Sequence, residues 1–178
     1  MAAPADAAGM SLTDLLVALA VLGLVVAAVL VGLDQGQRTY REGSARVEAQ
    51  QAARIALERM ARELRQAGTG LAPVALSVAE PARLVLHLDL DGDGAASGLR
   101  EAITWVLVGR VLRRDAGGGR QPVVEGVRDL RLAYFDAEDR PTAVADDVRR
   151  IDITIVTEGT PSGTGAAVLA TSVRLRNR

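Results

Sequence analysis

The fold is decided by residues 15–33, which read LLVALAVLGLVVAAVLVGL. This stretch runs for nineteen residues without a charged side chain. As an α-helix, at about 1.5 Å per residue, it reaches roughly 28 Å, close to the ~30 Å hydrocarbon core of a bilayer. A secretory signal peptide has a shorter apolar region with small residues after it, whereas here the small residues of segment 1–9 come first. The stretch is therefore predicted to span a membrane once.

The segment after the span is predicted to continue as the same helix. Residues 34–67 contain no proline and are rich in Ala, Glu, Gln and Arg, which favour helices. Small and apolar residues recur there at spacings of three and four and form one stripe: Ala49, Ala53, Ala56, Met60, Leu64 and Ala67. Gly68, Gly70 and Pro73 then supply stop signals. We expect the lipid-facing half to be followed by an amphipathic half that packs on a folded head.

Beyond residue 84 the apolar period changes from helical to two, which indicates strands. Alternation is clear around residues 84–90, 130–135, 151–155 and 169–175, and Gly109-Arg110 predicts a hairpin between two further strands. No helical pattern falls between the strands, so the sheet is predicted to be antiparallel. The predicted fold class is α+β: a long N-terminal helix packed on one antiparallel sheet of about five or six strands.

Composition argues against most kinds of catalytic or nucleic-acid-binding protein. The chain of 178 residues has no cysteine, one histidine, 2% aromatic residues and a net charge of −1. Thiolate chemistry and a histidine-based triad or metal site are therefore excluded, and stacking platforms for bases are scarce. With no Walker loop or nucleophile elbow in the sequence, we expect no enzyme. Four arginines near the hairpin are interpreted as a solvated face rather than a DNA contact: Arg110, Arg113, Arg114 and Arg120.

One acidic segment resembles the opening of a calcium loop. Asp89, Asp91 and Asp93 alternate before Gly94, but Arg100 stands where the closing bidentate glutamate belongs. Any calcium site would have to recruit Glu101 instead. An Asp/Gly-rich turn between strands is the favoured interpretation, and calcium is the one cofactor that the sequence leaves open.

Residues 9–20, GMSLTDLLVALA, resemble the class III prepilin signature, and residues 54–68, RIALERMARELRQAG, resemble the helix end of PilW-like minor pilins. The resemblance implies cleavage by a prepilin peptidase between Gly9 and Met10 and methylation of the new amino group of Met10. It also implies that Asp14 pairs with the amino terminus of a neighbouring subunit during assembly. The segment departs from the family because Asp14 replaces the usual glutamate and the leader has no basic residue. A local alternative is that Asp14 only flanks the helix start, where the helix dipole favours an acid.

The resemblance divides the chain into a leader (1–9), a membrane and filament-core helix (10–33), an amphipathic helix half (34–68) and a β head (69–178). It implies a minor pilin of a type IV pilus-like filament. Such a subunit sits in the bacterial inner membrane with a periplasmic head and then enters a pilus or pseudopilus. Its implied partners are other pilins, the prepilin peptidase, the assembly platform and membrane lipid. A J-type pseudopilin of type II secretion and an unprocessed bitopic membrane protein with a partner-binding head remain as alternatives.

Overall fold

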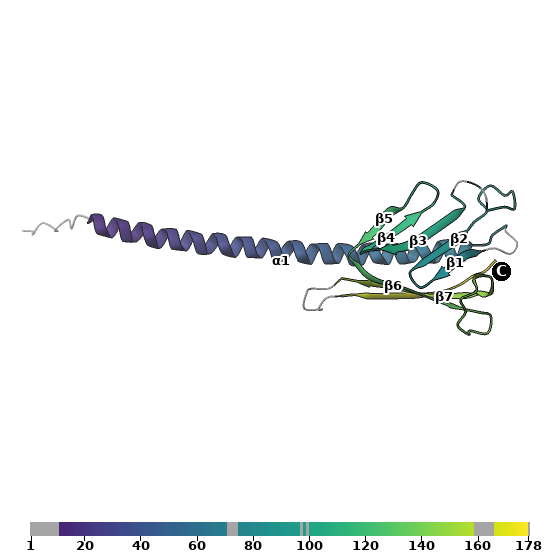
Figure 1. The fold of residues 1–178 in the computed structure, drawn as a ribbon. Coiled ribbons are helices and arrows are strands. Elements are labelled where there is room, and N and C mark those ends of the chain that lie inside the picture. Colours follow the sequence, from purple (N-terminus) through teal and green to yellow (C-terminus); the bar gives the residue numbers. More distant parts are fainter. Residues whose placement is uncertain (1–10, 71–74, 97, 99, 159–165, 178) are drawn as a thin grey trace, which may run out of the picture. The chain divides into compact units, whose positions relative to one another are not determined.

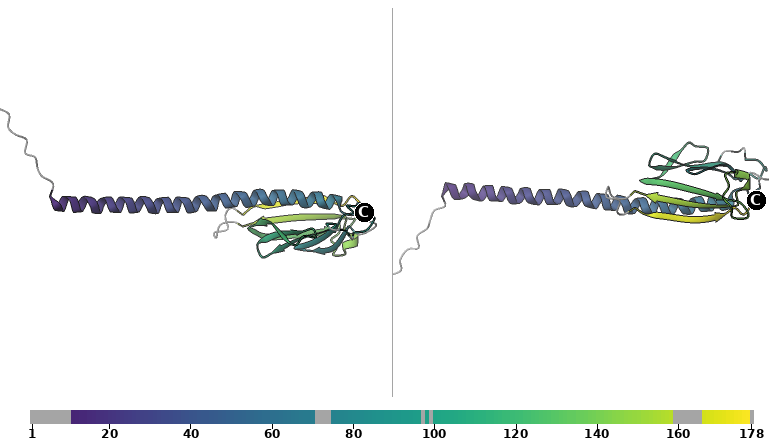
Figure 2. Two further views of the ribbon diagram at one scale, coloured as in Figure 1. Left: turned by 90° about the horizontal axis from the view of Figure 1, so that it is seen from above. Right: turned by 60° about the horizontal axis from the view of Figure 1, so that its bottom comes forward.

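The structure, a computed structural model, describes residues 11–70, 75–96, 98, 100–158 and 166–177 (Figures 1 and 2). The chain divides into two compact units, Met1–Ser44 and Ala45–Arg178. The elements are α1 (Leu12–Gln66), β1 (Leu76–Glu80), β2 (Arg83–His87), β3 (Ala102–Val108), β4 (Val111–Asp115), β5 (Gln121–Glu125), β6 (Val127–Phe135), the 3₁₀ turn η1 (Ala145–Asp147), β7 (Arg150–Thr157) and β8 (Val168–Arg174).

In the first unit, the part of α1 before Ala45 carries the apolar run. Its large apolar side chains are exposed within the unit, including Leu15, Leu22 and Leu30. Among the described residues, α1 is the one helix long and apolar enough to cross a membrane. This agrees with single-pass membrane anchoring, because a water-exposed helix with such a surface would be strongly disfavoured.

In the second unit, α1 supplies one side of the core. Ala49, the first member of the predicted stripe, is half-buried, and the buried Leu57 and Ala61 extend the stripe. The other five members are fully buried: Ala53, Ala56, Met60, Leu64 and Ala67. The helix ends at Gln66, one residue before the predicted end at Ala67. Gly68 follows with φ +79°, a left-handed conformation that glycine adopts without strain. A Cβ on Gly68 would lie 2.7 Å from the carbonyl oxygen of Asn177, so space also requires glycine there.

The strands form two antiparallel sheets, ordered β1-β2-β3-β4-β5 and β6-β7-β8. The α+β class and the hairpin at Gly109-Arg110 are confirmed. The expectation of one sheet of five or six strands is wrong, because the described residues contain eight strands in two sheets. The strands that the pattern missed, β1 and β5, are the two edges of the larger sheet. Pro81 follows β1 and Pro122 lies within β5, which an edge strand tolerates but a central strand does not.

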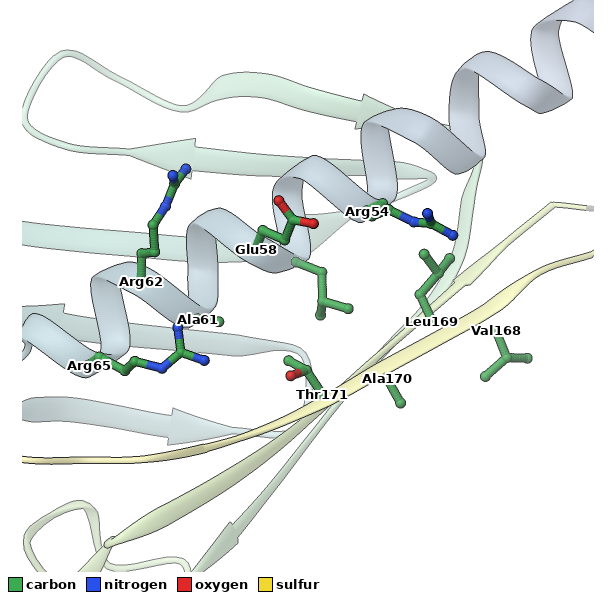
Figure 3. A pocket seen from close by; sticks show the side chains of 10 residues that line it. Arg54, Glu58, Ala61, Arg62, Arg65, Val168, Leu169, Ala170 and Thr171 are labelled. Carbon is green, nitrogen blue, oxygen red and sulfur yellow. The ribbon is translucent and has the colours of Figure 1, made fainter.

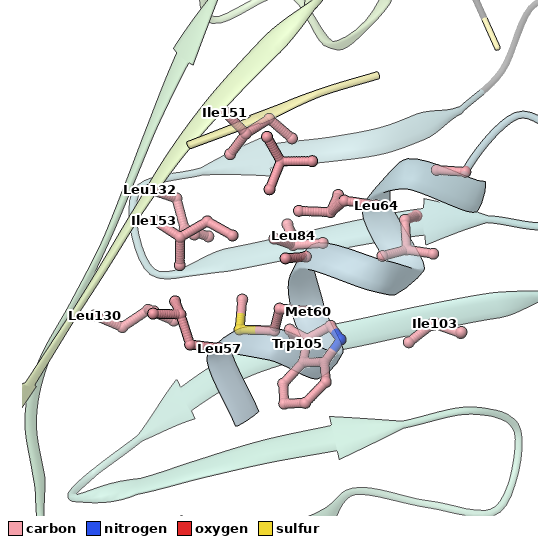
Figure 4. Packing of buried hydrophobic residues seen from close by; sticks show 14 of the residues in the cluster. Leu57, Met60, Leu64, Leu84, Ile103, Trp105, Leu130, Leu132, Ile151 and Ile153 are labelled. Atoms are coloured by element: carbon pink, nitrogen blue, oxygen red, sulfur yellow. The ribbon is translucent and has the colours of Figure 1, made fainter. Parts of the chain in front are cut away.

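A single apolar core joins α1 to both sheets. In Figure 4 the helix side chains Leu57, Met60 and Leu64 lie among buried residues of both sheets: Leu84, Ile103 and Trp105 from the first, and Leu130, Leu132, Ile151 and Ile153 from the second. The two sheets are also tied by a polar contact, because the Tyr134 hydroxyl donates to the backbone oxygen of Glu80 at 2.7 Å. Burial raises the pKa of Tyr134, with a smaller contribution from the charge of Glu80, so the hydroxyl keeps its proton and remains a donor.

Candidate functional site

The N-terminal signature is described from Ser11 onward, so the predicted cleavage point between Gly9 and Met10 lies outside the described residues. Asp14 lies in the first turn of α1. The Ser11 N–H donates to Asp14 Oδ2 at 3.2 Å, and the Thr13 N–H donates to Ser11 Oγ at 3.3 Å. The pattern is close to a capping box, with Ser11 Oγ accepting from the second helical residue rather than the third, and it satisfies backbone donors at the helix start. Asp14 therefore has a local role within its own chain, and its role between subunits stays a prediction.

The acidic segment folds so that Asp89, Asp91 and Glu101 each bring a carboxylate oxygen within 4.8 Å of the others. Asp93 is not in this group; its Oδ1 accepts from the backbone N–H of Ala95 at 2.7 Å. Glu101 is only 1% exposed, although the sequence pattern placed it one position late for a calcium loop. The structure thus brings together three of the four predicted ligands.

The side chain of Glu101 stabilises the loop by accepting hydrogen bonds from backbone N–H groups of the loop. Its Oε1 accepts from the N–H of Leu90 at 3.0 Å and its Oε2 accepts from the N–H of Gly98. These two hydrogen bonds lower the pKa of Glu101, so the folded loop favours the carboxylate. Because the folded-state pKa lies below the ordinary value, this stabilisation is present at neutral pH. It is lost as the pH falls through the lowered pKa.

The neighbouring carboxylates raise the pKa of Asp91, whereas the pKa of Glu101 is lowered. The backbone N–H of Asp93 lowers the pKa of Asp91, but desolvation and the charges of Asp93, Glu101 and Asp89 together outweigh it, and the net pKa is raised. Like charges at such distances disfavour one another. A divalent cation held by oxygen ligands would relieve this repulsion, which is why calcium stays a chemical prediction for the loop.

Millimolar calcium is expected to raise the melting temperature of the full chain in neutral-detergent micelles, and magnesium less so. For a weak site with a Kd of about 10⁻³ M, calcium at ten times Kd adds about 1.4 kcal/mol by mass action. Asp91→Ala is expected to abolish the shift, whereas Asp93→Ala serves as the matched control that retains it. Identical melting curves with calcium and with chelator at equal ionic strength would contradict the prediction.

His87, the single histidine, is half-buried at the end of β2. Its Nε2 lies 2.8 Å from Ser77 Oγ, and its Nδ1 is buried without a hydrogen-bond partner among the described residues. Desolvation lowers the pKa of His87, so the neutral ring is favoured. His87 is therefore a packed strand residue. Because it is the single histidine of the sequence, no second imidazole is available for a metal site.

The arginines near the hairpin do not form one basic surface. Arg114 Nε donates to Glu63 at 2.9 Å, and Arg110 Nη1 lies 2.6 Å from a carboxylate oxygen of Glu158. Arg113 Nη1 donates to the backbone oxygen of Arg120 at 3.2 Å. Two of the four charges are thus paired within the head, which favours the solvated or structural interpretation over contact with DNA.

The polar centre of the head was missed by the sequence analysis. Glu63 is buried on α1, and its Oε2 accepts from Trp105 Nε1 at 2.7 Å. Its Oε1 accepts from Arg114 Nε at 2.9 Å and from Arg59 Nε at 3.1 Å. One carboxylate therefore links α1 to β3 and β4. The available signal was its position beside Leu64 and three residues after Met60, which places a charge on the apolar stripe.

No protein-family model matches the sequence, and a search of curated proteins finds no match.

Proposed function

We propose that this chain is a non-catalytic subunit of a type IV pilus-like filament, of the minor pilin kind, processed after Gly9 and assembled through its N-terminal helix. The observation that carries the proposal is the order of features along the sequence from Gly9 through α1. A glycine, an acid and an uncharged span follow one another at the spacing of a prepilin signature. The helix then continues without a break to Gln66, where its buried stripe belongs to an α+β head.

The physical logic of assembly rests on two halves of one helix. The exposed apolar side chains of its first half need lipid before assembly and other apolar helices afterwards. A carboxylate at the centre of a membrane helix costs about 2.5 to 3.5 kcal/mol on insertion scales, and one near the end of the span costs less but is still disfavoured unless it is paired. A positive amino terminus on a neighbouring subunit would supply that pair. A J-type pseudopilin of a secretion system would use the same device.

The mature protein isolated from its native host is expected to begin at Met10 with a methylated amino group. Gly9→Val should block this cleavage, because the proposed peptidase recognises the glycine before the cut. Gly23→Ala is the matched control, since a Cβ at Gly23 meets no atom within 4 Å and the position lies within the span.

Intact-mass analysis of the membrane and filament fractions measures the outcome. Retention of residues 1–9 in filament-incorporated protein would contradict the proposal. A full-length chain that stays in the membrane fraction and never enters filaments would instead identify the bitopic membrane protein.

A further inference from the structure

A groove runs between α1 and strand β8 (Figure 3). It has a volume of about 600 Å³. Its apolar lining includes Leu57 and Ala61 of the helix and Leu169 of the strand, and Thr171 of the strand lines it as well. The helix also contributes Glu58 and three arginines, which are Arg54, Arg62 and Arg65. A second hollow continues it past Ile55 and Val168, two apolar residues that are 63% and 68% exposed.

The arginines of this groove have no acidic partner within the part of the chain that the structure describes. The salt bridges of α1 involve Arg38 and Arg59 instead. Among the described residues that line the groove, Glu58 is the single acid, so these residues carry a net charge of +2 from three arginines and one glutamate. Arg54 and Arg65 are eleven residues apart, which is roughly 16 Å along a helix. That is the length of about five residues of extended chain.

Strand β8 is an edge of the three-stranded sheet, and its outer backbone groups have no hydrogen-bond partner among the described residues. At one end Thr157 N–H donates to Ala167 O, and at the other Leu175 N–H donates to Arg149 O, both at 2.9 Å. Hydrogen bonding alternates along an antiparallel ladder, so every second residue between these ends bonds to β7. The backbone N–H and C=O groups of Val168, Ala170 and Ser172 therefore point away from β7.

Over most of its length this edge carries none of the usual devices against pairing, and the charged Arg174 lies only at the end of β8. Residues 167–172, AVLATS, contain no charge and no proline, the devices by which edge strands usually avoid partners. An open edge, an apolar floor and a row of arginines thus lie side by side. Strand addition uses such an edge for main-chain hydrogen bonds and the adjoining side chains for specificity.

We propose that this groove binds an extended acidic segment of a partner protein, which adds as a further strand to β8. Side chains on one face of a strand recur every two residues, at about 6.7 Å. Acidic residues four positions apart therefore span ~13 Å, close to the ~12 Å rise between Arg54 and Arg62. An apolar residue midway between them faces Leu57 and Ala61. The proposal requires neither cleavage after Gly9 nor entry into a filament.

The test uses the full chain in neutral-detergent micelles and a fluorescein-labelled peptide with the sequence Glu-Thr-Val-Thr-Glu-Thr-Val. Fluorescence anisotropy is expected to show saturable binding that weakens at least tenfold from 50 to 300 mM salt. A peptide with Gln in place of Glu should bind at least tenfold more weakly. Arg54→Glu combined with Arg62→Glu should cause a similar loss, whereas Arg128→Glu, an exposed arginine on β6, should change the Kd less than twofold.

Strand addition has a backbone signature that charge attraction lacks. N-methylation of one alternate set of peptide residues should abolish binding, and N-methylation of the other set should leave the Kd within twofold. Equal effects of the two sets, equal affinity of the double arginine variant, or no binding up to millimolar peptide would overturn the proposal. So would a dimer of the chain itself that the double variant dissociates, because the groove would then be an interface between copies.

Discussion

Replacing Glu63 with alanine is expected to lower the free energy of unfolding of the β head by about 3 kcal/mol, because it removes one partner of a buried ion pair. The Arg114 side chain is 17% exposed and would keep its charge without a carboxylate. The buried indole N–H of Trp105 would lose its acceptor as well. An unsatisfied buried donor adds its own desolvation penalty.

The measurement is urea unfolding of the full chain in micelles, followed by the fluorescence of Trp105, which is the single tryptophan. Glu58→Ala is the matched control, because Glu58 lies on the same helix but is exposed, and it is expected to change stability by less than about 0.5 kcal/mol. Glu63→Gln should fall between the two, since its amide oxygen can still accept from Trp105. A loss below about 1 kcal/mol for Glu63→Ala would show that the ion pair contributes little.

Replacing Asp14 with alanine is expected to reduce incorporation of the chain into filaments at least tenfold while leaving membrane insertion intact. Insertion should even improve, because a carboxylate near lipid is disfavoured on insertion scales. The expected loss has two sources that must be separated. One is the proposed charge pair with a neighbouring amino terminus, and the other is the capping box with Ser11.

Two further variants separate these sources. Asp14→Asn keeps a side-chain oxygen that can accept from Ser11 but removes the charge, whereas Asp14→Glu keeps the charge. If pairing between subunits governs assembly, Asp14→Asn should fail like alanine and Asp14→Glu should assemble. Normal assembly of Asp14→Asn, scored by immunoblotting of sheared filaments, would assign Asp14 to the helix cap alone.

The helix and most strands followed from the sequence because their signals are periodic and local. An uncharged run, a stripe at spacings of three and four, and alternation at Ile151, Ile153 and Ile155 each require only neighbouring residues to agree. The division into two sheets did not follow, because it depends on which strands pair across long separations. The strands β1 and β5 were missed since edge strands are short, partly exposed and tolerant of proline.

The candidate sites were predictable to different degrees. Asp89, Asp91 and Glu101 were singled out from a loop pattern, and their proximity follows because the loop is only thirteen residues long. Glu63 and Arg114 are 51 positions apart, so their pairing is a product of tertiary packing. The groove along β8 could not be predicted either, because it arises from an edge strand and a helix that no local pattern brings together.

Asn177 forms hydrogen bonds with the residues that end helix α1 and follow it. Asn177 Nδ2 donates to Thr69 Oγ1 at 2.8 Å and to the backbone oxygens of Ala67 at 3.3 Å and Arg65 at 3.4 Å, and so satisfies carbonyls that a helix end leaves open. Asn177 follows Ala67 by 110 residues. During synthesis the apolar span therefore leaves the ribosome well before the Asn177 contact with the helix end can form. A nascent chain that stops before residue 177 would lack the side-chain donor to the backbone oxygens of Arg65 and Ala67.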